Sequence, residues 1–350
     1  MEKIISLVYK LARERSLTIE EYAELIDGRT NESAELLRSL AVNERKKHYG
    51  NTVFIRGLIE VSNICKNNCI YCGIRRDNTD CERYRLSEEE ILSCADEGYA
   101  LGFRTFVMQG GEDPYFDDER LSEIVRRIKK KYPDCAVTLS MGERSRESYE
   151  ALYAAGADRY LLRHETASAD HYASLHPSEM SFENRMRCLY DLKDIGFQTG
   201  CGFMVGSPYQ TSEHIARDLK FIEEFKPEMC GIGPFIPHKA TPFRSEAAGS
   251  VELTCYLLSI VRLIVPTVLL PATTALGSLE EGGRERGILS GANVVMPNLS
   301  PMEARGKYEL YNNKLFTKAE SAQALDELKE RIAQIGYEVV SARGDAKKYN

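Results

Sequence analysis

The sequence predicts an α/β protein whose core is a (β/α)8 barrel of the TIM type, with helices before the barrel and a capping segment with a helix after it. Eight short apolar runs alternate with amphipathic segments. Eight such units over about 250 residues favour a closed barrel over an open doubly wound sheet. Polar or glycine-rich residues follow most of the runs, as expected where the carboxyl ends of barrel strands form an active-site face. The runs span residues 53–61, 104–108, 136–140, 159–163, 198–205, 229–236, 268–271 and 293–296.

The segments between the runs have recognisable helix ends. Thr18 and Ser87 are each followed three residues later by Glu, the pattern of a capping box, and Thr211 opens a further helix. Four glycines stand between a helical segment and the next run, where a residue in the left-handed conformation ends a helix. These glycines are Gly102, Gly156, Gly196 and Gly291.

We therefore divide the chain into three parts. Residues 1–48 are expected to form an N-terminal helical extension, and residues 49–298 the barrel. Residues 299–350 are expected to form a C-terminal extension that caps the barrel and contains a last helix near residues 319–335.

Composition argues against two classes of partner. The formal net charge is −7, whereas a protein that binds nucleic acid needs a concentrated Lys and Arg surface. Residues 1–17 carry charges throughout, unlike a secretory signal, and no apolar run reaches the roughly 18 residues of a membrane span. We expect no nucleic-acid partner, no membrane partner and a cytoplasmic location, where the ten cysteines would stay reduced.

Three cysteines lie close together directly after the first run. Cys65, Cys69 and Cys72 are separated by three and then two residues, and Tyr71 precedes the last of them. A loop of this length can place three thiolates around one 4Fe-4S cluster and leave the fourth iron open. A structural zinc site is the competing interpretation, but zinc normally takes four ligands at short spacings, and Cys81 lies farther away. The spacing favours the cluster.

This cysteine triplet resembles the signature of the radical S-adenosylmethionine (SAM) superfamily. The resemblance implies a single-electron reduction of the cluster, by a reductant such as ferredoxin or flavodoxin, and cleavage of SAM to methionine and a 5′-deoxyadenosyl radical. It also implies a SAM site beside the cluster. Gly110, Gly111 and Glu112, after the second run, resemble the superfamily's GGE motif, whose backbone carbonyls accept hydrogen bonds from the SAM ammonium.

The resemblance leads us to expect further SAM contacts from the next strand ends. Glu165 and Arg185 are candidates for the amino-acid end of SAM, because Arg presents a planar fork to a carboxylate. The other candidates are Ser140 and Glu143 for the ribose hydroxyls, and Tyr71 and Met204 for the adenine.

Six longer blocks are similar to the HydE family of FeFe-hydrogenase maturases. They lie at residues 69–78, 111–115, 157–166, 231–238, 271–277 and 291–298. The resemblance implies a role in H-cluster assembly, in which the adenosyl radical attacks the sulfur of a cysteine-bound iron complex with carbon monoxide and cyanide. It implies a pocket lined by Arg163, Thr273, Thr274, Met296, Tyr308 and Tyr311.

Two further observations concern the interior and the number of clusters. Runs five and six are rich in glycine, which weakens a strand and indicates that something approaches the backbone closely, so we expect a barrel with room inside. Some relatives carry a second cluster near the C-terminus, but no cysteine follows Cys255 here, so we expect a single cluster.

Three alternatives stay open at this point. A mutase such as 3-methylornithine synthase would share the barrel, the cluster and Glu112, and would act on an amino acid. Sulfur insertion of the biotin-synthase type would need a sulfur donor inside the barrel. An iron–sulfur carrier would bind the cluster without cleaving SAM. For the mutase, the expected partners are a small amino acid and a reductant. For the maturase, they are an organometallic substrate and other hydrogenase maturation proteins.

Overall fold

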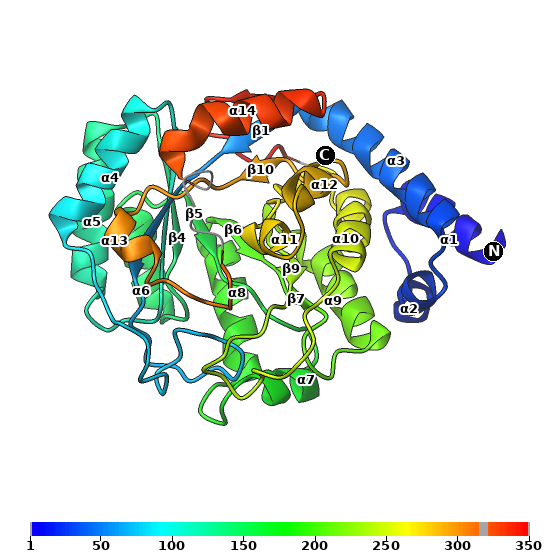
Figure 1. The fold of residues 1–350 in the computed structure, drawn as a ribbon, viewed down its shortest axis with the longest axis horizontal. Helices are drawn as coiled ribbons and strands as arrows, with labels where there is room; N and C mark the ends of the chain where they lie inside the picture. The colour runs from blue at the N-terminus through cyan, green and yellow to red at the C-terminus, as the bar shows by residue number, and fades with distance from the viewer. Residues whose placement is uncertain (1, 315–320, 349–350) are drawn as a thin grey trace.

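The computed structural model describes residues 2–314 and 321–348, with a ring of parallel strands at its centre (Figure 1). The strands are β1 (Thr52–Ile55), β2 (Gly57–Ser62), β3 (Thr105–Gly110), β4 (Ala136–Ser140), β5 (Arg159–Leu161), β6 (Gln198–Cys201), β7 (Met204–Val205), β8 (Met229–Cys230), β9 (Gly233–Pro234), β10 (Val294–Val295) and β11 (Glu338–Val340). The helices are α1 (Glu2–Glu14), α2 (Ile19–Asp27), α3 (Asn31–Tyr49), α4 (Glu88–Ala100), α5 (Asp118–Lys131), α6 (Arg146–Ala154), α7 (Ala169–Leu175), α8 (Phe182–Ile195), α9 (Ser212–Phe225), α10 (Val251–Ile264), α11 (Thr274–Leu279), α12 (Gly283–Ile288), α13 (Met302–Arg305), the 3-10 turn η2 (Ala322–Ala324) and α14 (Leu325–Gln334).

The ring of strands is closed, which confirms the predicted barrel. Six strands form one parallel sheet in the order β2-β3-β4-β5-β6-β8. Isolated bridges then join β8 to Leu269, Pro271 to β10, and Asn298 back to β2. Residues 268–271 contribute bridges rather than a regular strand, and Pro271 has no amide hydrogen to donate there. All eight apolar runs therefore contribute to the ring.

The helix ends form where the sequence predicts them. Thr18, Ser87 and Thr211 each accept a hydrogen bond from the N3 amide in a capping box, at the starts of α2, α4 and α9. The four glycines expected at helix ends have φ between +95° and +108°. A residue with a Cβ rarely adopts this conformation, so glycine at these positions lets the chain turn back to the next strand.

The N-terminal helices pack against the outside of the barrel. α2 contacts α9, and α3 contacts α10. The Tyr22 hydroxyl donates to Glu223 of α9 at 2.9 Å, and the Ser16 hydroxyl donates to the same carboxylate at 2.7 Å. No helix within the described ranges has both the length and the apolar character needed to cross a bilayer. The division of the chain at residues 48 and 298 stays a prediction.

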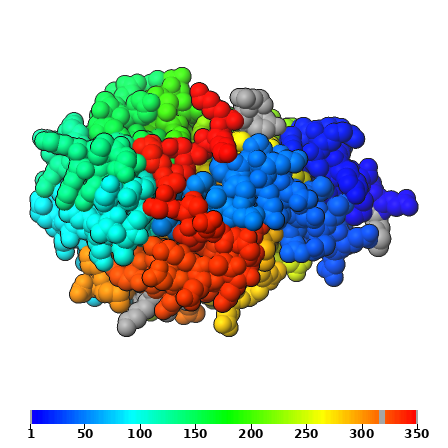
Figure 2. All heavy atoms as spheres, turned by 90° about the horizontal axis from the view of Figure 1, so that it is seen from above, coloured from blue at the N-terminus to red at the C-terminus, as the bar shows by residue number. Residues whose placement is uncertain are grey.

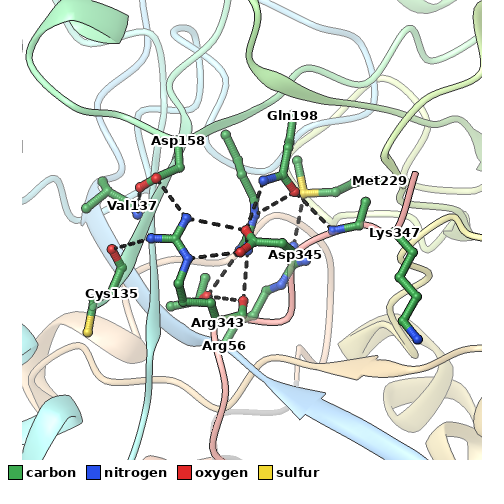
Figure 3. A network of polar contacts seen from close by, with 12 residues as sticks. Arg56, Cys135, Val137, Asp158, Gln198, Met229, Arg343, Asp345 and Lys347 are labelled. Atoms are coloured by element: carbon green, nitrogen blue, oxygen red, sulfur yellow. Dashed lines mark hydrogen bonds and ion pairs between the residues drawn. The ribbon is translucent and has the colours of Figure 1, made fainter. Parts of the chain in front are cut away.

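The C-terminal residues return to the amino ends of the barrel strands. α14 covers most of the last predicted helix, whose residues 319 and 320 lie outside the described ranges. β11 pairs with β1 in parallel, and the last residues lie between the blue N-terminal part and the cyan-to-green part of the chain (Figure 2). Beyond β11, Asp345 accepts a hydrogen bond from Arg159 at 2.6 Å. It accepts another from Gln198 at 2.9 Å (Figure 3). The segment that carries Asp345 thus covers the end of the barrel at which the strands begin, which we call the floor of the barrel.

Asp345 compensates positive charge that is buried in this floor. Arg159 is 0% exposed and Arg56 is 5% exposed, and burial lowers the pKa of both guanidinium groups. Arg343 donates to Asp345 and to Asp158, at 2.9 Å in each case. Partial burial raises the pKa of Asp345, but the hydrogen bonds from Arg343 and Gln198 and the charge of Arg159 bring it far below its ordinary value. The carboxylate is therefore ionised at neutral pH.

Asp345→Asn is expected to lower the free energy of unfolding by about 1–2 kcal/mol at pH 7, because the buried Arg159 guanidinium would lose its carboxylate partner. The loss of stability is small because the Asp345 side chain is 40% exposed, so solvent weakens its interaction with Arg159. Its folded pKa is depressed, so this stabilisation is present above the unfolded pKa of about 4 and is lost as the pH falls toward the folded value.

Urea denaturation of the apo chain at pH 7 and at about pH 3, followed by circular dichroism, measures this difference. The control is Asp326→Asn, which changes a carboxylate that is 92% exposed on α14. Equal stability of wild type and Asp345→Asn at pH 7 would contradict the role of the carboxylate in the floor.

Candidate functional site

A cavity of about 360 Å³ opens at the carboxyl ends of the barrel strands. Glu143 does not line it and faces a neighbouring hollow of about 300 Å³. All the other candidate cluster, SAM and substrate residues predicted from the sequence line this cavity. These lining residues are Cys65, Cys69, Tyr71, Cys72, Gly110, Gly111, Glu112, Ser140, Arg163, Glu165, Arg185, Met204, Thr273, Thr274, Met296, Tyr308 and Tyr311.

The loop that carries the three cysteines follows β2 and is held by Arg83. A guanidinium group presents five N–H donors in a fixed plane, so one side chain can bind several carbonyl oxygens at once. Arg83 donates to the backbone oxygens of Asn63 at 2.6 Å, Ile74 at 2.8 Å, Arg75 at 2.6 Å and Asn78 at 3.1 Å. The two ends of the cysteine loop are therefore tied to one side chain.

The three thiols fit a cluster better than a single metal ion. No three His, Cys, Asp or Glu side chains in residues 2–314 and 321–348 converge closely enough to hold one ion, whereas a cuboidal cluster takes its thiolates at separate corners. The cysteines form no disulfide. Burial raises the pKa of Cys65, Cys69 and Cys72, the last to about 12. Iron would supply the positive charge that such buried thiolates need.

The glycine-rich turn after β3 packs directly on the cysteine loop. The Lys66 amide donates to the Glu112 carbonyl oxygen at 3.0 Å, and the Glu112 amide lies 3.4 Å from the Cys65 sulfur. A Cβ atom on Gly111 would lie 2.2 Å from the Ile64 carbonyl oxygen, so a larger residue would push the turn away from the loop. The turn is thereby fixed at the cavity wall beside the thiols.

Arg185 connects the end of β5 to Glu143. Its Nε donates to Glu143 Oε1 at 2.5 Å, and its Nη1 donates to the Arg163 carbonyl oxygen at 2.6 Å. Asn184 donates to the other Glu143 oxygen at 2.5 Å. Both Glu143 oxygens are thus engaged behind the cavity wall, where they hold Arg185 in place. A contact between Glu143 and a ribose stays a prediction.

The cavity has an apolar corner made of aromatic and sulfur-containing side chains. Met204, Phe235 and Phe243 form a cluster against which Tyr71 packs. The Tyr71 ring lies edge-on to the His176 ring, with 5.5 Å between the ring centroids. Flat apolar walls of this kind suit a heterocyclic base. The arrangement agrees with the predicted adenine site for Tyr71 and Met204, which no contact in the structure tests.

Several buried polar atoms on the cavity wall have no hydrogen-bond partner in the described part of the chain. They are Nε and Nη2 of Arg163, Oε2 of Glu165 and Oγ1 of Thr273. Nη2 of Arg163 lies 3.1 Å from Glu165 Oε2, without hydrogen-bond alignment. By contrast, Thr274 Oγ1 accepts from Arg284 at 2.9 Å, and the Tyr308 hydroxyl accepts from Gln109 at 3.3 Å. Other buried polar atoms without partners lie elsewhere in the described chain, but these line a cavity, where a bound molecule can satisfy them.

The comparisons with known proteins identify the family. Residues 59–222 match the model described as the radical SAM superfamily. The chain is 46% identical, over 88% of its length, to the [FeFe] hydrogenase maturase subunit HydE of Thermotoga maritima, and it covers 88% of that protein. The chain belongs to the HydE family of radical SAM enzymes. It is thus an enzyme of hydrogenase maturation, and its family implies a 4Fe-4S cluster and SAM.

More distant relatives of this HydE-family enzyme share its barrel. The chain is 28% identical, over 84% of its length, to 3-methylornithine synthase of Methanosarcina acetivorans, and it covers 83% of that protein. The solved structure of methylornithine synthase (PylB) matches it with a TM-score of 0.82 and 26% identity, over 95% of this chain and 97% of that one. These matches confirm the radical SAM barrel.

Sequence analysis missed a buried ion pair in the cavity wall of this HydE-family enzyme. Lys314 Nζ contacts the Glu60 carboxylate of β2 and donates to the Tyr308 carbonyl oxygen at 2.8 Å. Asn298 donates to the other Glu60 oxygen at 2.9 Å. A charged residue within the apolar run 53–61 was the available signal. The partner of Glu60 is 254 residues away, so no local pattern could reveal it.

Arg83→Met in this HydE-family enzyme is expected to reduce the iron bound after anaerobic reconstitution by about tenfold, as removal of a group that orients metal ligands commonly does. The reason is that several carbonyl oxygens of the cysteine loop would lose their common donor. Iron and sulfide analysis, with the absorbance of the cluster, measures the effect. The control is Arg126→Met, which removes only an exposed contact with Glu123 on α5. Full iron loading of Arg83→Met would show that the loop does not depend on this side chain.

Proposed function

We propose that this enzyme acts on a small cysteine-bound Fe(CO)2(CN) complex during assembly of the diiron site of FeFe-hydrogenase. When bound, a 4Fe-4S cluster on Cys65, Cys69 and Cys72 together with SAM would supply a 5′-deoxyadenosyl radical. The side chains of the protein would bind and orient SAM and the substrate. The observation that carries the proposal is the set of partnerless buried polar atoms in a cavity that also holds the three thiols.

The proposed SAM site uses the glycine-rich turn that packs on the cysteine loop, together with side chains of the cavity wall. We assign the backbone carbonyls of Gly110 and Gly111 to the SAM ammonium, and Arg185 and Glu165 to its amino-acid end. Arg185 is held by Glu143 and by the end of β5, so its planar guanidinium would meet a carboxylate without further ordering. We assign Ser140 to the ribose and Tyr71 with Met204 to the adenine.

Charge at the substrate end favours an anion over a free amino acid such as lysine. Arg163 contributes N–H groups without hydrogen-bond partners in the described chain, with Glu165 as its ion-pair partner at 3.1 Å, and Thr273 contributes a hydroxyl that is also without a partner there. Glu60, the carboxylate on this side of the cavity, is already paired with Lys314 and Asn298. The ammonium group of lysine would find no carboxylate there, apart from Glu165, which we assign to SAM. The polar groups at this end of the cavity therefore support a maturase reaction over a mutase reaction.

The exposed side of the cysteine loop supports an acidic reductant. Lys66 and Arg76 are both exposed on this loop, where Lys66 contacts the Glu112 carboxylate and Arg76 that of Asp77. Opposite charges speed the encounter of redox partners, so we propose that a ferredoxin- or flavodoxin-type protein docks there. Other hydrogenase maturation proteins would supply the iron complex or accept the product.

The deciding experiment separates three functions in one assay. The enzyme is reconstituted anaerobically and reduced, and 5′-deoxyadenosine and adenosylated products are quantified with SAM alone, with SAM plus the iron–cysteine–carbonyl–cyanide complex, and with SAM plus L-lysine. Stimulation by the iron complex alone, with adenosyl–sulfur products, is expected. Stimulation by lysine alone would favour the mutase, and an intact cluster without SAM cleavage in any tube would favour a carrier.

Cys69→Ser tests the assignment of the cluster. A serine hydroxyl is a poor ligand for iron compared with a thiolate, so the variant is expected to lose both the brown colour and the cleavage of SAM. Cys94→Ser is the matched control, because Cys94 is a buried cysteine of α4 outside the cavity lining. SAM cleavage by Cys69→Ser at the wild-type rate would show that the ligand assignment is wrong.

Thr273→Val tests the substrate end. It replaces a hydroxyl by a methyl group of the same shape, and it is expected to raise the Kd of the iron complex about tenfold if the hydroxyl binds that complex. The melting temperature is expected to stay unchanged, because Thr273 Oγ1 has no partner in the described protein. Thr254→Val is the control, since its buried hydroxyl donates to the Ser250 carbonyl oxygen at 2.8 Å. The control should lower stability and leave the Kd unchanged, and an unchanged Kd in Thr273→Val would remove this residue from the site.

A further inference from the structure

Glu165 has an unusual backbone conformation at the wall of the cavity. Its φ is +65°, in the left-handed region that residues with a Cβ rarely adopt. Its amide donates to the Gly202 carbonyl oxygen at 3.0 Å, so a neighbouring strand segment holds this conformation in place. Strained residues of this kind persist only where the surroundings determine them, and they cluster at functional sites.

His164, the preceding residue, binds the other side of the same glycine. Its ring is 0% exposed and packs edge-on against Phe221, with 4.8 Å between the ring centroids. Nδ1 accepts a hydrogen bond from the Gly202 amide at 3.2 Å. Because an accepting ring nitrogen carries no hydrogen, Nε2 is the protonated nitrogen of the neutral ring. Burial lowers the pKa of His164 to about 3, so the ring is neutral at physiological pH.

Asp218 of α9 faces both ends of the turn that contains Glu165. His164 Nε2 lies 3.3 Å from Asp218 Oδ1, and the Ala167 amide donates to the same oxygen. Asp218 is 0% exposed, and burial raises the pKa of its carboxyl group well above the ordinary value. Within residues 2–314 and 321–348 His164 Nε2 meets no acceptor with hydrogen-bond geometry, and the Asp218 carboxylate at 3.3 Å is the acidic group beside it.

Filling space does not account for this arrangement. A buried polar pair costs free energy to desolvate, and apolar side chains of similar volume commonly fill such a space at no loss of stability. Each polar contact of His164 and Asp218 is made to the turn 164–167 or to Gly202, which also binds Glu165. The polar contacts of His164 and Asp218 are therefore made to residues on either side of Glu165 and to the glycine that binds it.

We propose that His164 and Asp218 are positioning residues that hold Glu165 in its left-handed turn, so that its carboxylate points at the amino-acid end of SAM. His164, Asp218 and the backbone of Gly202 together form what we call the Glu165 clasp. The proposal rests on the proposed function, because it takes the Glu165 carboxylate as a SAM ligand. Neither His164 nor Asp218 touches SAM in this arrangement.

The test compares apolar and conservative variants at both positions. Asp218→Leu and His164→Leu remove the polar contacts and keep the volume, and each is expected to weaken SAM binding about 10- to 100-fold, the usual effect of losing a residue that orients a ligand group. Asp218→Asn keeps an acceptor oxygen, and His164→Asn places an amide oxygen where Nδ1 accepts. These two variants are expected to recover most of the affinity. The Kd for SAM is measured by equilibrium dialysis on the reconstituted enzyme, with iron content and melting temperature recorded for each variant.

A double-mutant cycle with Glu165→Ala shows whether the clasp acts through Glu165. The expected result is that Asp218→Leu weakens SAM binding in the wild-type background and has no further effect in the Glu165→Ala background. The same cycle with His164→Leu keeps the test available if Asp218→Leu does not fold. Crystal structures of the leucine variants are expected to show Glu165 outside the left-handed region.

The possible outcomes separate the clasp from the proposed function. Additive effects in the cycle, or a left-handed Glu165 and wild-type SAM affinity in both leucine variants, would overturn the clasp. Wild-type SAM affinity in Glu165→Ala would instead overturn the assignment of Glu165 to SAM, and the clasp's role toward SAM would fall with it. A shift of Glu165 in the crystal structure would in that case still show that His164 and Asp218 hold the turn.

Discussion

The hydrogen bonds that return the chain to the first barrel strand are the contact on which the active-site face depends. The Leu58 amide donates to the Pro297 carbonyl oxygen at 2.9 Å, and the Leu299 amide donates to the Leu58 carbonyl oxygen at 2.7 Å. They bring the segment after the last strand beside the cysteine loop, where the Gly73 amide donates to the Leu310 carbonyl oxygen at 2.8 Å. If this sheet were left open between the last strand and β2, the two would lie at opposite edges, and the C-terminal segment would not reach the cysteine loop.

Closure also explains why the cavity holds so many charged groups without exposing them to solvent. Glu60 and Lys314 neutralise one another in the wall, and Arg185 is neutralised by Glu143 behind it. Charges paired in this way fix the shape of the cavity and contribute little net charge to its contents. Arg163 lies only 3.1 Å from Glu165 but keeps N–H groups without hydrogen-bond partners in the described chain. The cavity thus presents polar groups that are available to bind the polar groups of a ligand.

Local sequence was sufficient for the features that depend on spacing along the chain. The cysteine triplet, the capping boxes and the helix-ending glycines each occupy a few consecutive residues, so their patterns predicted their places. The eight runs predicted the barrel because strand and helix alternate at regular intervals. Many of the candidate lining residues follow strand ends, which parallel strands gather at one face. Arg185 in α8 and Tyr308 and Tyr311 after α13 do not, and the family resemblance supplied the two tyrosines. Of the candidates, Glu143 lies outside the cavity because Arg185 engages it.

Contacts between distant parts of the chain were beyond such patterns. Lys314 and Glu60 are 254 residues apart, and Arg159 and Asp345 are 186 residues apart. A buried charge within an apolar run signals that a partner exists, but its identity depends on the tertiary fold. The conformation of Glu165 was hidden for the same reason, because it is set by Gly202 and by a side chain on α9.

The closed floor has a consequence for how the protein is made. Asp345 follows all of the barrel strands in the sequence, and translation delivers the chain from its amino end. The barrel strands therefore leave the ribosome before the carboxylate that neutralises Arg159 and approaches Arg56. During synthesis the barrel strands therefore contain Arg56 and Arg159 before the carboxylate that compensates their charge is present. The floor of the barrel is therefore completed only after the segment that carries Asp345 has been synthesised.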